Sequence, residues 1–164
     1  MDEQFFHAAV QKVVGNLPSA TKSNHRNTLP RKEILRGYSA FAQMYKCGKR
    51  FFAPHCVCCA VEQNQLSLSH LPTDIHVIVG FSVSRSIRTA VERNRLKRLM
   101  RESYRINKHE LNEWCEKENK NIVLLFSFFN LKEITPKKFP FKEVEIEITS
   151  LLYQVLNWSK TEKQ

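Results

Sequence analysis

Residues 90–105 carry the pattern that most constrains how this 164-residue chain can fold. Wound as an α-helix at about 100° per residue, the segment divides into two faces of opposite chemistry. The basic face carries Asn94, Lys97, Arg98, Arg101, Arg105 and Lys108, and the opposite face carries Leu96, Leu99, Met100, Ser103, Tyr104, Ile106, Leu111 and Trp114. The apolar face can be buried against a sheet, whereas the basic face has to stay in water. The pattern therefore predicts a helix that covers a sheet and turns its arginines outward.

Positive charge is concentrated in residues 85–108, where nine Lys and Arg residues stand against Glu92 and Glu102, a formal net charge of +7. Like charges at helical spacing repel each other by about 0.2–0.5 kcal/mol per pair, so the fold alone gains nothing from them. The planar guanidinium of arginine matches phosphate better than the ammonium of lysine does. We therefore favour a polyanionic partner over the alternative, a basic face that is only solvated.

Composition supports the same class of partner. The whole chain has a formal net charge of +10, and 10% of its residues are aromatic. This combination favours a folded nucleic-acid-binding domain over a disordered basic tail. The N-terminal residues lack the basic and apolar regions of a signal peptide, no apolar run is long enough to span a membrane, and the five cysteines are odd in number. We therefore expect a cytoplasmic protein with reduced thiols.

The chain divides into an N-terminal extension at residues 1–27 and a single domain at residues 28–160. In the extension, apolar residues at helical spacing predict a short amphipathic helix, and residues 15–27 have the composition of a linker. Two interpretations stay open for this extension: a frayed, flexible segment, or a helix that docks on a partner.

The first element of the domain is a helix within residues 29–47. Ile34, Tyr38, Phe41 and Tyr45 form a stripe at helical spacing, and such stripes usually face a core. Gly37 interrupts the stripe, so the regular helix is expected to begin near Tyr38. Gly48 provides a stop signal at its end.

Extended segments follow. Residues 49–61 are expected to form a strand, followed by a turn through residue 64 and a second extended piece. Residues 75–83 alternate with period two, which predicts a central strand whose odd positions face the core. Its even positions end in Gly80, Ser82 and Ser84, small residues that would leave an open sheet face beside the arginine-rich helix.

The second half of the chain contains two helices and a strand. Thr89 and Glu92 fit a capping box, so the arginine-rich helix is expected to begin there, after a loop at residues 84–88, and to run to about residue 115 or 117. Residues 121–129 are a continuous apolar run typical of a buried strand. Residues 131–140 form a loop, and residues 142–158 form a closing helix. This order predicts an α+β layered fold.

Few side chains suggest catalysis by the protein itself. The cluster at residues 55–59 contains His55, Cys56, Cys58 and Cys59, but a strand would divide these side chains between two faces. We therefore favour buried structural thiols over a zinc site. Glu143, Glu145 and Glu147 lie at a spacing that does not share a helical face, and they are expected to be solvated. We expect no metal site and no catalytic residue in the protein.

The two segments Ser82-Val83-Ser84-Arg85 and Ala90-Val91-Glu92-Arg93-Asn94-Arg95-Leu96-Lys97-Arg98, with Arg101 and Glu102 after them, closely resemble the signature of the bacterial ribonuclease P protein subunit. The resemblance covers residues 29–158. It implies a two-layer α/β sandwich of order α-β-β-β-α-β-α with a left-handed crossover. The family usually has glycine at the position of Arg88 and often has an aromatic residue at that of Cys59, so both positions depart from its pattern.

The resemblance also implies a function. Members of this family assist a catalytic RNA with bound Mg²⁺, which removes the 5′ leader of precursor tRNA. The residues expected to bind RNA are Arg85, Arg93, Asn94, Arg95, Lys97, Arg98, Arg101 and Arg105. Those expected to line a groove for the single-stranded leader are Phe41, Tyr45, Lys49, Arg50 and Ser82. Two alternatives remain: a non-catalytic RNA-binding protein, such as a ribosome-associated factor, and a DNA-binding basic helix, which would need a dimerising zipper that the sequence does not show.

Overall fold

The computed structural model describes residues 28–67, 71–72, 74–87, 89–129 and 138–161. The expected extension at residues 1–27, most of the expected loop at residues 131–140, and the departure at Arg88 lie outside the described residues. The division into an extension and a domain at residues 28–160 therefore stays a prediction.

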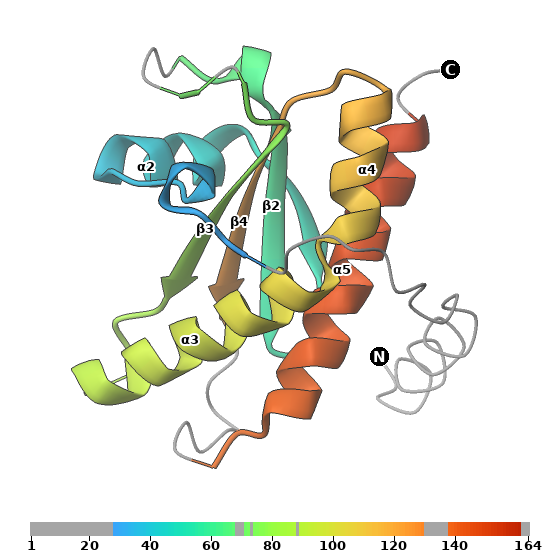
Figure 1. Ribbon diagram of the computed structural model, residues 1–164. Coiled ribbons are helices and arrows are strands. Elements are labelled where there is room, and N and C mark those ends of the chain that lie inside the picture. The colour runs from blue at the N-terminus through green and yellow to red at the C-terminus, as the bar shows by residue number, and fades with distance from the viewer. Residues whose placement is uncertain (1–27, 68–70, 73, 88, 130–137, 162–164) are drawn as a thin grey trace.

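The described chain is a mixed α+β fold (Figure 1). Its elements, in order, are η1 (Arg31–Glu33), α2 (Tyr38–Cys47), β1 (Lys49–Phe52), β2 (Cys56–Glu62), η2 (Gln63–Gln65), β3 (Val77–Val83), α3 (Ala90–Asn107), α4 (His109–Lys117), β4 (Ile122–Phe128) and α5 (Phe141–Thr161). The α+β class and the order α-β-β-β-α-β-α are confirmed, with the middle helix divided into α3 and α4. The expected strand at residues 49–61 is instead a hairpin, in which the amide of Ala53 donates to the carbonyl of Cys56 over 2.8 Å.

The four strands form one sheet in the order β1-β2-β4-β3. Strands β1 and β2 of the hairpin are antiparallel, and so are β2 and β4, whereas β3 lies parallel to β4. The prediction that β3 is a central strand is wrong, because β3 lies at the edge of the sheet. Its outer side is partly covered, since the amide of Leu35 donates to the carbonyl of Val79 over 2.9 Å. Because β3 is covered on its outer side and buried on both faces, its sequence is as apolar as that of a central strand.

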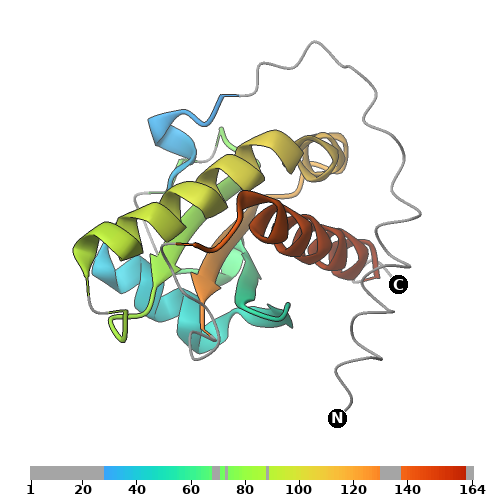
Figure 2. The same cartoon turned by 90° about the horizontal axis from the view of Figure 1, so that it is seen from below.

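Helices α3, α4 and α5 cover one face of the sheet and α2 covers the other (Figure 2). The odd positions of β3 face the three helices, as predicted, and the rings of Phe81, Tyr104 and Phe126 lie about 6 Å apart there (6.0, 6.1 and 5.9 Å between centroids). The buried residues of α5 are Val144, Glu147, Ile148, Leu151, Leu152, Val155, Leu156 and Ser159. The predicted closing helix is therefore confirmed, and these residues form the face that packs on the core.

The opposite face of the sheet is not open along its whole length, as its small residues suggested. At Gly80 the space above the sheet is filled: a Cβ there would lie 3.0 Å from Cδ1 of Leu125 and 3.3 Å from Cδ2 of Leu35. The prediction of an open face is wrong at Gly80 because Leu35, which precedes α2, packs onto this glycine. Farther along the chain, Ser82 near the end of β3 is half-buried and Ser84, just after the strand, is exposed.

Helix α2 buries a face that its aromatic stripe did not indicate. The buried residues are Ala40 and Met44, whereas Tyr38 is 91% exposed. The prediction that the aromatic stripe faces the core is wrong for Tyr38 and Tyr45, because the side of α2 that packs against the core carries Ala40, Met44 and the half-buried Phe41. Gly37, with φ +93°, begins the helix in a conformation that suits glycine. Gly48 ends it as predicted, and a Cβ there would lie 2.5 Å from the carbonyl oxygen of Met44.

The long helix predicted to reach residue 115 or 117 is broken at Lys108. This residue ends α3 and begins α4, and its ammonium lies 2.5 Å from Oε2 of Glu33. Lys108 is only 4% exposed. Its assignment to the solvated basic face is therefore wrong, because the break in the helix turns its side chain toward the carboxylate of Glu33.

Glu147 also differs from its prediction. It is buried, and Oε2 accepts hydrogen bonds from the amides of His55 and Cys56 over 3.1 and 2.9 Å. Its other carboxylate oxygen, Oε1, lies 2.6 Å from Nδ1 of His55. The prediction of a solvated side chain is wrong because the hairpin supplies donors that satisfy this carboxylate. Glu147 thus attaches α5 to the start of β2.

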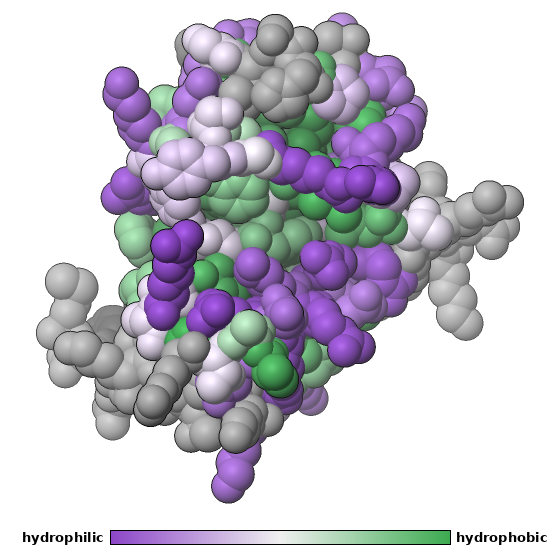
Figure 3. Space-filling model, turned by 90° about the vertical axis from the view of Figure 1, so that its left-hand side faces the viewer, coloured by the Kyte–Doolittle hydropathy of each residue, from purple (hydrophilic) through white to green (hydrophobic). Residues whose placement is uncertain are grey.

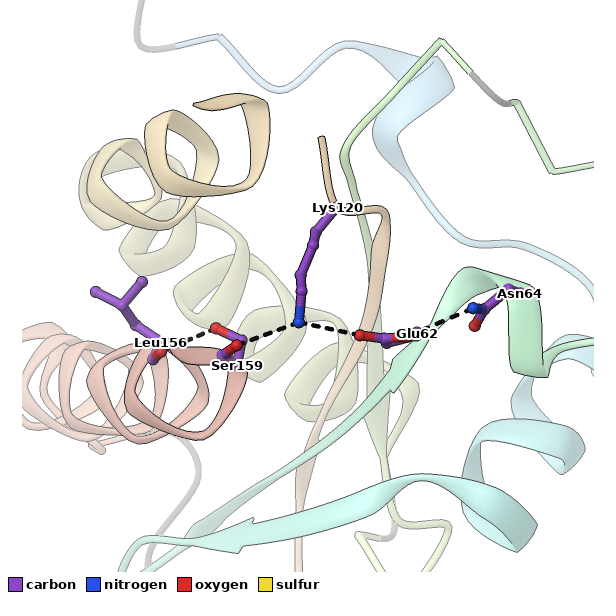
Figure 4. A network of polar contacts seen from close by, with 5 residues as sticks. All are labelled: Glu62, Asn64, Lys120, Leu156 and Ser159. Atoms are coloured by element: carbon purple, nitrogen blue, oxygen red, sulfur yellow. Dashed lines mark hydrogen bonds and ion pairs between the residues drawn. The ribbon is translucent and has the colours of Figure 1, made fainter. Parts of the chain in front are cut away.

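A second polar network connects the end of β2 with the C-terminal part of α5. The ammonium of Lys120 lies 3.2 Å from Oε1 of Glu62 on β2 and donates to the carbonyl of Ser159 on α5 over 3.2 Å (Figure 4). The same ammonium lies 5.6 Å from the ring centroid of Trp114 on α4. One side chain thus connects the sheet with both helices, and it fixes where the chain enters β4.

Candidate RNA-binding surface

Helix α3 begins with the predicted cap. The amide of Glu92 donates to the hydroxyl oxygen of Thr89 over 3.2 Å, and that hydroxyl donates to the carboxylate of Glu92 over 2.8 Å. Just inside the helix, the guanidinium of Arg93 donates to the carbonyl of Ile87 over 2.6 Å. These contacts fix the first turn of α3 against the loop that contains Arg85, whose side chain is exposed. The cap and the loop thus set the direction in which the basic side chains leave the helix.

The two-faced character predicted for α3 is confirmed. Leu96, Met100, Ser103 and Tyr104 are its buried residues. Asn94 and Arg98 are exposed on the other side, and Lys97 is half-buried. Hydrophilic side chains accordingly gather over α3, below α2, on the face shown in Figure 3.

Like Arg93, the side chains of Arg95, Arg101 and Arg105 on α3 also contact the protein itself. Arg95 donates to the carbonyl of Phe139 over 3.1 Å, and the guanidinium of Arg101 lies 5.9 Å from the ring centroid of Phe81. Arg105 forms an ion pair with Glu102 at 2.9 Å. These contacts leave the three guanidiniums half-buried, so their positions are partly set before any partner binds.

The open part of the sheet lies beside α2. The hydroxyl of Tyr45 lies 2.7 Å from Oγ of Ser127 on β4, and Ser127 is the register partner of Ser82 on β3. The guanidinium of Arg50 on β1 donates to the carbonyl of Tyr45 over 2.9 Å. Tyr45, Arg50 and Ser82, all predicted to line one groove, are therefore brought to one face of the sheet.

The other two predicted groove residues differ from these. Phe41 is half-buried and packs against the core beneath α2. Lys49 lies on the opposite face of β1, where its ammonium is 5.5 Å from the ring centroid of Trp158 on α5. The structure does not bring Lys49 to the face that carries Tyr45, because neighbouring strand residues point to opposite sides.

Three residues of this open face escaped the sequence analysis: Phe52, Ser127 and Phe129. Phe52 follows Arg50 by two positions, and Phe129 follows Ser127 by two positions, so each pair shares a side of its strand. The apolar run at residues 121–129 concealed this, because its alternation is visible only once one side is known to be open.

The cysteines of the cluster at residues 55–59 lie in the core. Cys56, Cys58 and Cys59 are buried, and all five cysteines are free thiols. Burial raises the pKa of Cys56 and of Cys58 well above the ordinary value, and the carboxylate of Glu147 adds to the effect at Cys56. Among the described residues, no three His, Cys, Asp or Glu side chains form a group that could hold a metal ion. Within the same residues, none of the helices has both the length and the hydrophobicity needed to cross a membrane.

Comparison with known proteins places this geometry in a family. The family model described as Ribonuclease P matches residues 29–153. The chain belongs to the ribonuclease P protein family. The ribonuclease P protein component of Syntrophus aciditrophicus is 35% identical over 98 residues, which cover 60% of this chain and 71% of that protein. The same component of Chlorobaculum tepidum is 36% identical over 95 residues, 57% of this chain and 60% of that protein.

A solved structure supports the fold of this ribonuclease P family member. The Staphylococcus aureus RNase P protein superposes with a TM-score of 0.55 at 17% sequence identity, covering 75% of this chain and 94% of that one. The resemblance inferred from the arginine-rich motif is thereby confirmed for both family and fold. The roles of individual residues in binding RNA stay predictions.

Proposed function

We propose that this ribonuclease P protein component binds the catalytic RNA of ribonuclease P and the 5′ leader of precursor tRNA. In this way it assists the endonucleolytic removal of the leader, which leaves a 5′-phosphate on the mature tRNA. The observation that carries the proposal is the two-sided helix α3, with Leu96 and Met100 fully buried and Arg98 exposed.

Helix α3 binds the phosphates of the catalytic RNA. Each phosphate neutralised by Lys or Arg releases counterions, so binding weakens with salt by about 0.7–0.9 log units per log unit of salt. Arg95 and Arg101 are held by Phe139 and Phe81, so less side-chain entropy is lost when they meet a phosphate. Asn94, Lys97 and Arg98 complete this surface, with Arg93 and Arg105 at its two ends and Arg85 in the preceding loop.

The leader crosses the sheet beside α2. The ring of Tyr45 offers a platform for an unstacked base, a contact worth about 1–3 kcal/mol. Arg50, bonded to the carbonyl of Tyr45, supplies positive charge for the leader backbone. The small side chain of Ser82 leaves room for the RNA to approach the sheet, and Phe41 packs against the core beneath α2.

The chemistry belongs to the RNA in this proposal. Hydrolysis by the catalytic RNA depends on Mg²⁺, an ion that takes oxygen ligands. The Lys, Arg and Asn side chains on the exposed face of α3 do not fit such an ion, since like charge repels it. Mg²⁺ is therefore assigned to the RNA and the substrate, and this chain neutralises phosphates close to them. The reaction is placed in the cytoplasm, where the five thiols stay reduced.

Reconstitution tests the proposal. The full chain is added to its cognate ribonuclease P RNA at a Mg²⁺ concentration too low for the RNA alone, and 5′ maturation of precursor tRNA is followed. We expect cleavage to appear with the protein and to be absent without it. Tight binding to the RNA with no gain in cleavage would contradict the proposal, and would favour a non-catalytic protein that binds structured RNA.

A further inference from the structure

Two phenylalanines that the proposed function does not use lie exposed on the open face of the sheet. Phe52, at the end of β1, is 53% exposed, and Phe129, just after β4, is 48% exposed. Their ring centroids lie 6.0 Å apart at an interplanar angle of 85°. Leaving two large apolar side chains in water is unfavourable, and their mutual contact covers only part of each ring.

The Phe52/Phe129 pair lies on the face that carries Tyr45. The hydroxyl of Tyr45 contacts Ser127 on β4, and Phe129 follows Ser127 by two positions, so both side chains point to the same face. Phe52 shares its side of β1 with Arg50, whose guanidinium is bonded to the carbonyl of Tyr45. The pair therefore belongs to the same surface as the platform proposed for the leader.

One row of register partners connects the pair with the arginine-rich side of the molecule. Phe52 pairs with Val57, Val57 with Ser127, and Ser127 with Ser82. Three strand spacings separate the ends of this row, roughly 14 Å. At its far end, Ser82 leads within three residues to Arg85 and the loop before α3. The row marks a path across the sheet from Phe52 to the loop that contains Arg85, and Val57 and Ser127 within it are themselves buried.

We infer that the Phe52/Phe129 pair is a second stacking site for the single-stranded leader, distinct from the platform at Tyr45. This inference rests on the proposed function. The guanidinium of Arg50 on the same side of β1 complements the phosphates of an RNA strand, and exposed rings stack on any base. A second copy of the chain fits less well, because two molecules with a net charge of +10 repel each other.

The path sets an order along the leader. Because α3 is proposed to neutralise phosphates close to the catalytic Mg²⁺, leader nucleotides next to the cleavage site lie near Ser82 and the loop before this helix. Nucleotides farther from it reach the aromatic pair, in which Phe52 belongs to β1 at the opposite edge of the sheet and Phe129 follows β4. A short leader ends before the pair, and a long leader covers it. The pair therefore makes affinity depend on leader length.

The test uses the holoenzyme assembled from the full chain and its cognate RNA. Affinity is measured for precursor tRNAs whose leader lengthens one nucleotide at a time, with the wild type and with the double variant Phe52→Ala/Phe129→Ala. As the leader lengthens, we expect the affinity of the wild type to rise in two steps, the first when a base reaches Tyr45 and the second when a base reaches the Phe52/Phe129 pair. The double variant should lose the second step, about tenfold in Kd, and keep the first. Phe52→Tyr/Phe129→Tyr keeps both rings and should keep both steps.

Controls separate the possible failures. Tyr153→Ala removes a comparably exposed ring from α5, on the opposite face of the sheet, and should change neither step. If the double variant keeps both steps, the inference is wrong while the proposed function stands. If the wild type shows no leader-dependent gain at all, the proposed leader groove fails as well. A wild-type dimer that the double variant disrupts, seen by sedimentation, would assign the rings to self-association and overturn the inference.

Discussion

The ammonium of Lys108 and the carboxylate of Glu33 form a shielded ion pair, with Nζ and Oε2 2.5 Å apart. Only 5% of the lysine side chain and 17% of the glutamate side chain are exposed. The pair joins η1, which runs into the bridge between Ile34 and β3, to the break between α3 and α4. It therefore helps to fix the end of the arginine-rich helix relative to the sheet.

Removing one partner of this pair should destabilise the protein. Lys108→Met leaves the carboxylate of Glu33 shielded without a counter-charge, and we expect the free energy of unfolding to fall by about 3 kcal/mol. The double variant Lys108→Met/Glu33→Gln removes the stranded charge and should recover part of the loss. Urea denaturation measures both, with Lys160→Met as a control at an exposed site on α5. Equal losses in the single and double variants would show that packing, not charge, is what Lys108 supplies.

Salt dependence should report the phosphate contacts of α3. Lys97→Ala/Arg98→Ala removes two cations from its outer side, and the slope of log affinity for the catalytic RNA against log salt should flatten by about 1.4–1.8. Lys142→Ala/Lys160→Ala removes two exposed cations from α5 and serves as the matched control. Filter binding over a range of salt concentrations gives both slopes. If Lys97→Ala/Arg98→Ala keeps the wild-type slope while its circular dichroism shows an intact fold, the assignment of RNA contacts to α3 is wrong.

The ring and the hydroxyl of Tyr45 should have separable effects. Tyr45→Phe removes the hydrogen bond to Ser127, which should cost about 1 kcal/mol of stability and leave leader binding nearly unchanged. Tyr45→Ala also removes the ring, and affinity for precursor tRNA should fall about tenfold relative to mature tRNA. Competition between the two RNAs measures this ratio. An equal loss of affinity for both would indicate damage to the core instead.

Alkaline pH should destabilise the fold through Cys115. Burial raises the pKa of this thiol from 9.0 to about 12, with Lys120 opposing the effect. The unfolded chain ionises first, so stability present below pH 9 is lost as pH rises toward 12. The loss amounts to about 1.4 kcal/mol per pH unit for one thiol. Stability should therefore fall less steeply for Cys115→Ala than for the wild type in denaturation series above pH 9. Parallel curves would contradict this role of the thiol.

The elements that the sequence predicts well are those defined by their own local pattern. Helix α3 repeats its two faces over five turns, and its cap at Thr89 and Glu92 is a contact between residues three apart. Helix α5 and strand β4 have unbroken apolar patterns. In each case neighbours along the chain provide the information, so no knowledge of the fold is needed.

The errors share one physical origin, which is contact between distant parts of the chain. Lys108 is buried in a contact with Glu33, which lies 75 residues away in the sequence. Glu147 is buried in a contact with His55, which lies 92 residues away. Neither partner can be identified from the local pattern. The edge position of β3 likewise depends on which strands pair. In α2 the pattern itself was ambiguous, since Ala40 and Met44 form a second stripe beside the aromatic one. Of the predicted groove residues, Tyr45, Arg50 and Ser82 come to one face of the sheet, whereas Phe41 packs against the core and Lys49 lies on the opposite face. The roles of all predicted site residues stay predictions.

The parallel pairing of β3 with β4 makes the sheet and the arginine surface a single cooperative unit. The two strands are neighbours, yet the chain between them consists mainly of α3 and α4. Because residues of α3 pack against β3 and β4 in one core, we expect the two strands and this helix to form and open together. Amide hydrogens of α3 and β4 should therefore exchange with solvent at similar rates. An RNA bound to the arginines of α3 should therefore also slow hydrogen exchange at the amides of β4, which the RNA does not contact.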